Sequence, residues 1–447
     1  MKKILLLTMI ISLPAFGQQQ GGRPLSLQEC RQLALEYNEQ IKTAENAVAK
    51  SKLDRQIAFA QYLPKLDGSV ALIHMKNVDI LDQEFIGMQL QTRGTYMAGL
   101  NLTMPLYVGG QITSANRLAR IGETVSQEML RKTRMQVIAD VDNTYYTLIA
   151  VHSKVEMLEA YSRQMQELYD QVKLAASVQL ATDNDLLRVS TKQNEVDYQL
   201  QKARNGEQLC GLALANILGA DFEQTIIPTD TLSVYGAQTS TLNPQTSILS
   251  EDFSSRPDLL LLQQQVKASE AMVKKTRSNY LPTVALVGRI SHYDNLKLKG
   301  DMNLPSFRPL GINHTISGGS PMAMLSVSVP IFHWGAEIKK LKKAKLDLYD
   351  AKLQLQQNER GMRVEVHKAV QNVIDSRRMV QTATVGRQQA DENLRIMRQK
   401  YDNQLCTLTD LLDAQSQWQQ ARSNLIEAQA QLKIYETEYL RVTGRLE

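Results

Sequence analysis

The sequence predicts a mainly α-helical protein with a smaller part of amphipathic β-strands, and it predicts that this arrangement occurs twice. Three observations support this fold class. Landmark residues return after 225 residues, two proline-free stretches favour long helices, and short stretches beside prolines alternate apolar and polar residues. Hydrophobic residues make up 43% and aromatic residues 6% of the 447 residues. This composition suits long exposed helices better than a compact enzyme core.

The N-terminus has the pattern of a secretory signal peptide. Two lysines precede an apolar run over residues 4–13, and Ala15 and Gly17 supply the small residues of a cleavage site. We therefore predict that residues 1–17 are removed and that the mature chain leaves the cytoplasm. A short membrane anchor is the alternative, but the apolar run is too short to span a bilayer.

Charge and cysteine content bear on several classes of protein. Lys and Arg number 51 against 46 Asp and Glu, a net charge of +5, without a basic stripe, so we expect no nucleic acid partner. No later apolar run reaches the roughly 18 residues of a spanning helix, so a membrane crossing would require a β-barrel.

The cysteine content does not indicate a disulfide framework, because the count is odd: Cys30, Cys210 and Cys406. A Cys30–Cys210 disulfide would suit an oxidising compartment, but unpaired small hydrophobes are favoured.

Landmarks at fixed spacing indicate an internal repeat. The "YLP" motif at 62–64 returns at 280–282, an offset of 218, so a difference of 7 residues lies between this motif and the next landmark. A fixed part and a variable part suggest a packed scaffold that carries a surface loop. The pairs at an offset of 225 are Pro105 and Pro330, Gly110 and Gly335, Asp185 and Asp410, and Gly219 and Gly444.

We predict two structural repeats, residues 18–224 and 258–447, joined by a Ser/Thr/Pro-rich segment over 225–257. The elements expected inside them are helices over 25–62 and 258–280, strand pairs over 64–105 and 282–330, and long helical hairpins over 111–218 and 336–443.

The hairpins are predicted from proline-free length and from apolar periodicity. Residues 111–178 and 336–403 contain no proline, and about 68 residues at about 1.5 Å each give helices of roughly 100 Å. The segment that follows each break carries an apolar stripe of period seven, typical of coiled-coil-like packing. In the second copy this stripe is Leu411, Trp418, Leu425, Leu432 and Tyr439.

The strands are predicted from period-two alternation, clearest in "TYMAGLNLTMP" and "PMAMLSVSVP". Such strands suit a membrane barrel with a wet lumen or a half-buried soluble sheet, and alternation alone does not choose between them. Segments Asp79–Gly94 and Asp294–Ser320 are expected to be surface loops. Closed membrane barrels begin at about eight strands, so four strands per chain would require several copies to form one pore.

An ordered set of motifs resembles the outer-membrane efflux protein family, the TolC-like channel-tunnels. The motifs are "LSLQECRQLALEYN", "YLP" before each strand pair, "MPLYVGG" and "VPIFHWG" before the long helices, and "YDNQLCTLTDLLDAQ". They cover essentially the whole mature chain. The resemblance implies a homotrimer with a 12-stranded outer-membrane β-barrel, to which each protomer gives four strands. It also implies a 12-helix α-barrel in the periplasm and an equatorial region that contains residues 225–257.

The resemblance also implies a function and partners. It implies a passive exit duct of a tripartite efflux or type I secretion system, located in the outer membrane with its helical part in the periplasm. The implied partners are a periplasmic adaptor (membrane fusion) protein, an inner-membrane pump of the resistance-nodulation-division or ABC type, and outer-membrane lipid. No cofactor and no metal are expected.

The resemblance places a gate at the tips of the helical hairpins. Asp410 and Asp413 align with two aspartates that form acidic rings at a closed periplasmic entrance, where like charges raise pKa values and attract cations. Asp185 and Tyr401 match positions that hold the tips shut through hydrogen bonds between hairpins. Ordinary helix N-terminal acids remain the alternative for these aspartates.

This sequence departs from the family at the tips. Cys406 stands where the family has a basic residue, and Gln179 and Gln404 stand where tip glycines are common. We therefore expect a gate without the Arg–Asp tie. The residues expected to contact the adaptor are Gln179, Leu180, Gln404, Leu405 and Cys406.

Two other classes of function compete with the duct. The six histidines show no metal-ligand spacing, and the sequence contains no nucleophile or phosphate-binding motif, so we do not expect an enzyme. The remaining alternative is a periplasmic coiled-coil adaptor or interaction protein without a membrane barrel.

Overall fold

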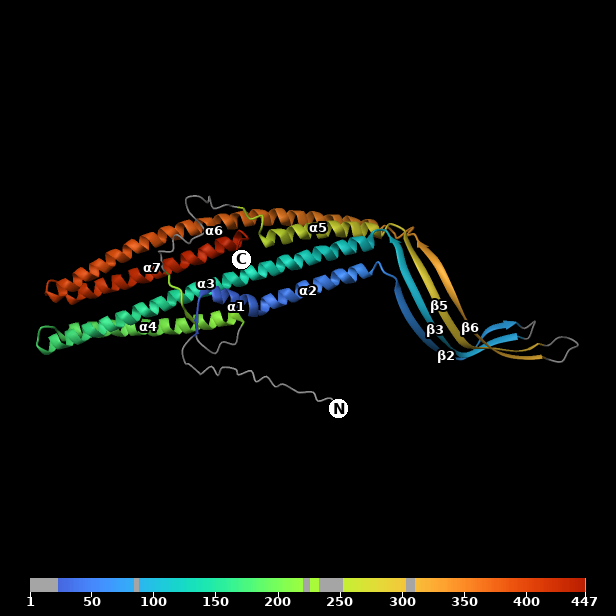
Figure 1. Ribbon diagram of the computed structural model, residues 1–447, viewed down its shortest axis with the longest axis horizontal. Helices are drawn as coiled ribbons and strands as arrows, with labels where there is room; N and C mark the ends of the chain where they lie inside the picture. Colours follow the sequence, from blue (N-terminus) through green and yellow to red (C-terminus); the bar gives the residue numbers. More distant parts are fainter. Residues whose placement is uncertain (1–22, 84–87, 220–225, 233–251, 303–309, 447) are drawn as a thin grey trace, which may run out of the picture. The chain divides into compact units, whose positions relative to one another are not determined.

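The computed structural model describes residues 23–83, 88–219, 226–232, 252–302 and 310–446. The predicted signal peptide lies outside the described residues, as does most of the predicted joint between the repeats. Helices dominate and strands form a smaller part, which confirms the predicted fold class (Figure 1). Within the described ranges, no helix is both long and apolar enough to cross a membrane.

The chain folds as two compact units, and each unit takes segments from both sequence repeats. Corresponding elements of the two repeats therefore lie in the same unit. The first unit comprises Met1–Thr43, Arg131–Arg256 and Gly361–Glu447, and the second comprises Ala44–Leu130 and Pro257–Arg360.

The second unit contains an antiparallel sheet of four strands in the order β2-β3-β5-β6, so β2 and β6 are its edges. The prediction of surface loops over Asp79–Gly94 and Asp294–Ser320 is wrong for most of their length, because strands extend through them. Paired extended backbone satisfies its own N–H and C=O groups, so the Gly, Asn and Asp content there did not end the ladder. The strands are β2 (Lys65–Gln83), β3 (Met88–Val108), β5 (Thr283–Met302) and β6 (Leu310–Ser328).

Helices lead into and out of this sheet. The Asn116 side chain of α3 donates to the Ala58 carbonyl of α2 at 2.7 Å, so these two helices pack together. The helices of the second unit are α2 (Glu39–Ala60), α5 (Pro257–Ser278), and the first parts of α3 (Gln111–Ser177) and α6 (Ala336–Asp402).

The first unit contains the remaining parts of α3 and α6 with the helices that return from them. A small parallel pair joins β1 (Arg23–Leu25) to β4 (Ile226–Pro228). The other helices are α1 (Leu27–Tyr37), α4 (Asp183–Leu218) and α7 (Leu408–Val442).

The core of the first unit follows the predicted apolar stripes. Val189 and Val196 of α4 and Leu411 and Trp418 of α7 are buried in one cluster with residues of α3. Side chains seven residues apart fall on one face of a helix, so each stripe packs against its neighbours. The α3 members of this cluster are Met157, Leu158, Tyr161, Met165, Leu168 and Val172.

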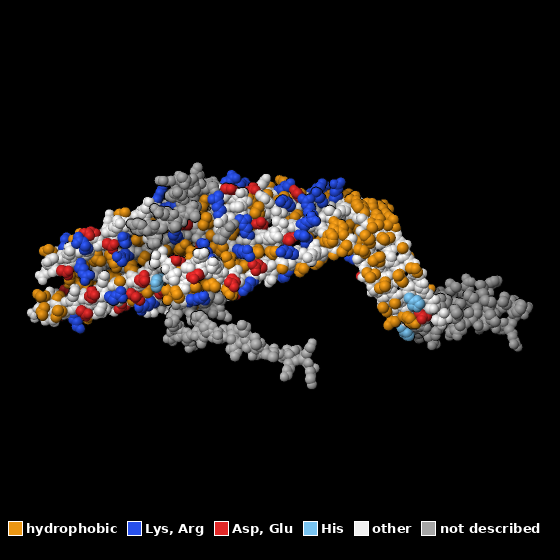
Figure 2. Space-filling model, viewed as in Figure 1, with side chains coloured by type: hydrophobic (Ala, Val, Ile, Leu, Met, Phe, Trp, Pro, Cys, Tyr) orange, Lys and Arg blue, Asp and Glu red, His pale blue; other side chains and the backbone are white. Residues whose placement is uncertain are grey.

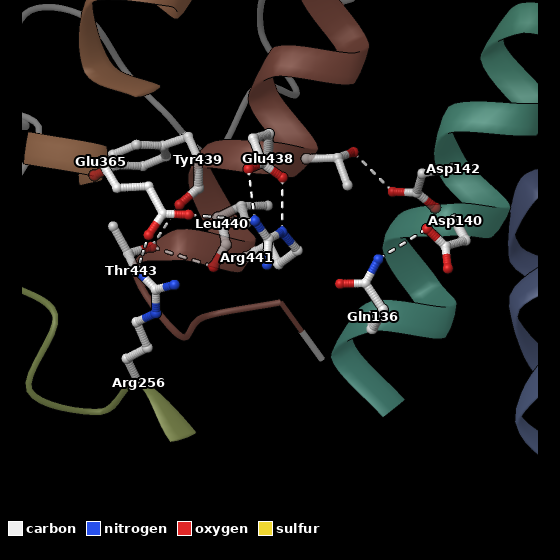
Figure 3. A network of polar contacts seen from close by, with 11 residues as sticks. Gln136, Asp140, Asp142, Arg256, Glu365, Glu438, Tyr439, Leu440, Arg441 and Thr443 are labelled. Carbon is white, nitrogen blue, oxygen red and sulfur yellow. Dashed lines mark hydrogen bonds and ion pairs between the residues drawn. The ribbon is translucent and has the colours of Figure 1, made fainter. Parts of the chain in front are cut away.

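A buried carboxylate connects three helices of the first unit. Asp142 of α3 has no solvent-exposed area and accepts from Arg31 Nε and Nη2 at 2.7 and 2.5 Å. The Thr437 hydroxyl of α7 also donates to it, at 2.8 Å. Arg31 and Thr437 compensate the loss of hydration that the buried carboxylate suffers. In the same region Arg256 donates to Glu365 at 2.6 Å (Figure 3).

Each return helix ends at a glycine with left-handed backbone. Gly219 after α4 has φ 65° and Gly444 after α7 has φ 74°, and the two stand 225 residues apart. A Cβ atom at Gly219 would lie 2.8 Å from the Tyr37 carbonyl oxygen, and one at Gly444 would lie 2.8 Å from the backbone nitrogen of Arg256. Both the conformation and the close approach therefore require glycine.

All three cysteines are unpaired, so the alternative of a Cys30–Cys210 disulfide is wrong. Cys30 is fully buried in α1, and burial raises the pKa of its thiol to about 12. A thiol that stays protonated in an apolar environment acts as a small hydrophobic side chain.

Candidate functional site at the helix tips

The two hairpins turn through the same backbone conformation. The first tip, residues 178–182, joins α3 to α4, and the second tip, residues 403–407, joins α6 to α7. Gln179 and Gln404 have left-handed backbone, with φ 63° and 60°. The next amides, of Leu180 and Leu405, donate 2.8 and 2.7 Å bonds back to the preceding helix. This is the Schellman closure that usually places glycine at the left-handed position, and glutamine there costs about 1 kcal/mol.

Each return helix begins with a reciprocal capping box. The Thr182 hydroxyl accepts from the Asp185 amide at 3.2 Å, and the Asp185 carboxylate accepts from the Thr182 amide at 3.1 Å. Thr407 and Asp410 make the same pair of bonds, at 3.2 and 2.9 Å. Asp185 and Asp410 therefore start helices, whatever further role they have.

The capping bonds also keep both carboxylates charged. Hydrogen bonds from Thr182 lower the pKa of Asp185 below its ordinary 3.8, and bonds from Thr407 do the same for Asp410. Asp410 and Asp413 are exposed, and their spacing of three places them on one side of α7. The second tip therefore presents two acids side by side to its surroundings.

Arg188 connects the two hairpins. Its guanidinium Nη1 on α4 donates to the Thr409 hydroxyl on α7. Cys406 instead faces its own hairpin, where its thiol lies 3.5 Å from the Met397 carbonyl oxygen. The structure thus has an arginine that connects the two hairpins, and it comes from α4 and not from the turn at Cys406.

Tyr401 lies at the end of α6, close to the first hairpin. Burial, followed by the nearby charge of Asp185, raises the pKa of its hydroxyl. Within the described part of the chain, this hydroxyl makes no hydrogen bond to another residue of the same protomer. The structure therefore brings Tyr401 and Asp185 near one another without joining them.

Below the tips, the hairpins pack through both apolar and polar side chains. Trp418 of α7 contacts Tyr161 of α3, with ring centroids 5.9 Å apart. Its indole N–H donates to Asp391 of α6 at 2.7 Å, and Arg422 lies 4.5 Å over its ring. These contacts hold the first and second hairpins together near the tips.

The adaptor-contact residues predicted from the sequence form the turns themselves. Leu180 and Leu405 are each 75% exposed, although both are large and apolar. Gln179 and Gln404 are exposed as well, whereas Cys406 is only half-buried. Each turn therefore presents one leucine to its surroundings.

Four residues of the site were missed at the sequence level: Arg188, Thr182, Thr407 and Thr409. Two of them had a recognisable signal, because Thr-x-x-Asp before an apolar run is the pattern of a capping box. Arg188 and Thr409 had none, since their contact joins positions 221 residues apart. Among the described residues, no group of three His, Cys, Asp or Glu side chains could hold a metal ion.

A profile of the family described as outer membrane efflux protein matches residues 30–220 and 248–445. The chain belongs to the outer membrane efflux protein family. This confirms the resemblance seen in the sequence.

Relatives of this outer membrane efflux protein are distant in sequence. It is 23% identical over 412 residues to the solvent efflux pump outer membrane protein SrpC of Pseudomonas putida, covering 89% of this chain and 80% of SrpC. Its fold is similar to that of CusC, with a TM-score of 0.78 at 15% identity, covering 96% of this chain and 95% of that one. The CmeC outer membrane channel of Campylobacter jejuni gives 0.73 at 18% identity, covering 94% and 86%.

Membership of the family has direct consequences. The protein is located in the outer membrane, and its helical part lies in the periplasm. Outer membrane efflux proteins are passive channels and not enzymes. They form trimers and work with adaptor and pump partners.

Proposed function

We propose that this outer membrane efflux protein is the exit duct of a tripartite efflux or type I secretion system, passing small molecules or proteins from a periplasmic pump and adaptor to the outside. The observation that supports this most directly is the two-faced sheet of the second unit. One face carries mostly large apolar side chains, whereas the other face carries polar side chains mixed with some apolar ones, such as Ile73 and Met324.

Directly opposed residues of antiparallel strands share a face, so the register assigns each side chain. Asp67, Asn101 and Arg289 are paired across β2, β3 and β5 and form a polar row, which ends at Met322 on β6. The opposite face is apolar and exposed, with Val70 77% and Leu72 81% exposed. Its large members are Leu66, Val70, Leu72, Leu100, Leu102, Leu286, Ile290, Leu325 and Val327. An apolar face suits lipid and a polar face suits a water-filled lumen.

The edges of this sheet support assembly. β2 and β6 each have a neighbour on one side only. An open edge in lipid leaves backbone N–H and C=O groups unsatisfied, at a cost of several kcal/mol for each group. Pairing of β6 with β2 of the next protomer would remove both edges. Three copies of four strands would then form a barrel of about 12 strands, within the range of known membrane barrels.

Conductance measurements test the duct. Protein extracted from outer membranes with detergent should have the mass of three chains and should form ion-conducting pores in planar lipid bilayers. A soluble periplasmic monomer without conductance would contradict this proposal and favour a coiled-coil adaptor or interaction protein.

We further propose that the tips form the periplasmic gate, with Asp410 and Asp413 in acidic rings and Asp185 and Tyr401 helping to hold the tips closed. Two facts support the proposal: the lowered pKa that keeps Asp410 charged, and the arginine tie beside it. The exposed turn residues Gln179, Leu180, Gln404, Leu405 and Cys406 would contact the adaptor.

Cation block of the pore tests the acidic rings. Replacing Asp410 and Asp413 together by Asn should weaken block by hexamminecobalt(III) several-fold, because three copies of each carboxylate would no longer attract it. Asparagine keeps a side-chain oxygen for the capping box. The matched control replaces Asp347 and Asp350, which are also exposed and spaced by three, and should leave the block unchanged. Equal block in both variants would remove the rings from the proposal.

A further inference from the structure

An exposed aromatic and basic segment connects β6 to the remainder of the second unit. We call residues 331–345 the junction segment. Ile331 is 92% exposed, Phe332 67% and Trp334 91%. The Phe332 and Trp334 rings contact each other edge to face, with centroids 5.1 Å apart. Such exposure of two large aromatic side chains leaves them available to a partner.

Trp334 has a backbone conformation that disfavours it. Its φ is 52°, in the left-handed region, and its counterpart 225 residues earlier is Gly109, with φ 61°. Glycine adopts this conformation without strain, whereas a bulky side chain does not. Because Trp334 is almost fully exposed, burial within the protomer does not offset the strain. The benefit of tryptophan must come from outside the single chain.

Lysines follow the aromatic pair immediately. Five lysines against one glutamate give the junction segment a formal charge of +4. All five are exposed, and Lys340 bonds to Glu337 at 2.9 Å. In the described part of the chain, the other four have no acidic partner within ion-pair distance. These four are Lys339, Lys342, Lys343 and Lys345.

The helix macrodipole does not explain why lysines are clustered at this position. α6 begins at Ala336, so the lysines occupy its first three turns, near the end where the macrodipole repels cations. On α5, by contrast, Lys275 and Arg277 occupy the last turn, which the macrodipole favours. The macrodipole therefore accounts for the basic residues of α5 but not for the α6 cluster. The two helix ends meet where the Asn279 amide lies 3.4 Å from Glu337.

The junction segment continues the apolar face of the sheet. Leu325 and Val327 on that face of β6 are 60% and 58% exposed, and the aromatic pair follows a few residues later. Figure 2 shows Lys and Arg side chains gathered over the helices beside the hydrophobic band of the strands. Apolar surface, then aromatic rings, then cations is the order that a protein presents across one leaflet of a bilayer.

We propose that the junction segment binds anionic phospholipid headgroups at the periplasmic surface of the outer membrane, with Trp334 and Phe332 at headgroup level and the lysines on the phosphates. This inference rests on the proposed function, because the strands must lie in lipid. The attraction is electrostatic and decreases with ionic strength.

Tryptophan fluorescence tests the proposal in the full-length trimer. The chain has two tryptophans, and Trp418 is only 6% exposed, in the core of the first unit. The trimer is reconstituted in bilayers of equal parts phosphatidylglycerol and phosphatidylcholine, with bromine near the headgroup on one lipid or the other. A Trp334→Phe variant measures the contribution of Trp418, which is subtracted.

We expect brominated phosphatidylglycerol to quench Trp334 several-fold more than brominated phosphatidylcholine, and expect high salt to reduce the difference. Replacing the five lysines by Gln should abolish the difference. The matched control replaces five exposed lysines elsewhere, Lys50, Lys202, Lys352, Lys368 and Lys400, and should preserve it.

Equal quenching by the two lipids, no quenching by either, or a preference that survives loss of the five junction lysines would overturn the proposal. Loss of the preference in the control variant would also overturn it, because net charge alone would then explain the result. If the lysine variant fails to form trimers while keeping the lipid preference, the lysines contact another protomer instead. Conductance of the wild-type protein reports the duct separately, so a failure here is distinguishable from a failure of the proposed function.

Discussion

At the scale of single residues, the acids at the tips show what a sequence can and cannot reveal. Asp185 and Asp410 were singled out because they recur at one offset, and the structure places both in capping boxes. The hydrogen bonds of a capping box can be predicted from the sequence pattern Thr-x-x-Asp. The proposed convergence of three copies of each acid on one axis cannot be predicted from local patterns, because it depends on the other protomers.

The tie between Arg188 and Thr409 belongs to the same scale and leads to a prediction. Arg188→Ala should destabilise the closed tips by about 1 kcal/mol, the usual net value of one hydrogen bond, and raise the resting conductance about fivefold. Single-channel recording of the reconstituted protein measures this change.

A double-mutant cycle supplies the control for that prediction. Thr409→Val removes the acceptor, so it should have the same effect as Arg188→Ala, and the double variant should be no worse than either single variant. Additive effects would mean that the two side chains act through different partners.

At the scale of helices and strands, sequence patterns were a good guide to helices and a poorer guide to strand ends. α3 and α6 follow proline-free stretches, because only proline removes both a donor and the room for a helical turn. The ends of β2 and β5 could not be predicted, because pairing with a neighbouring strand decides them and Gly or Asn content does not.

The left-handed glycine that ends α4 provides a test at this scale. Gly219→Ala should destabilise the first unit by about 2 kcal/mol or more, since it adds strain at positive φ and a clash with the Tyr37 carbonyl. Hydrogen exchange at the last turn of α4 would report the loss as faster exchange.

The matched control for this test is Gly122→Ala, about three turns into α3. A Cβ atom there meets nothing within 4 Å, so alanine should stabilise the helix by about 0.5–1 kcal/mol. If both variants exchanged at the same rate as the original protein, the close approach at Gly219 would not matter for stability.

At the scale of the whole molecule, the sequence repeat predicted the order of helices and strands along the chain better than it predicted which of them pack together. Each compact unit contains pieces of both repeats, so the boundaries of the repeats do not coincide with those of the units. The repeat could be found from landmark spacing, whereas the units depend on contacts between residues far apart in sequence. The partly buried ion pair of Arg31 and Asp142, 111 residues apart, is an example.

The closed turns at the tips have a consequence for how such a passage opens. Each turn is held on one side by the leucine amide bond back to the preceding helix and on the other by the threonine–aspartate capping box, so neither turn can open without breaking several hydrogen bonds at once. In the proposed gate, such turns favour opening by movement of whole helical hairpins over opening by loosening of the turns. Under this proposal, opening would be controlled by side chains that connect one hairpin to the next, as Arg188 does.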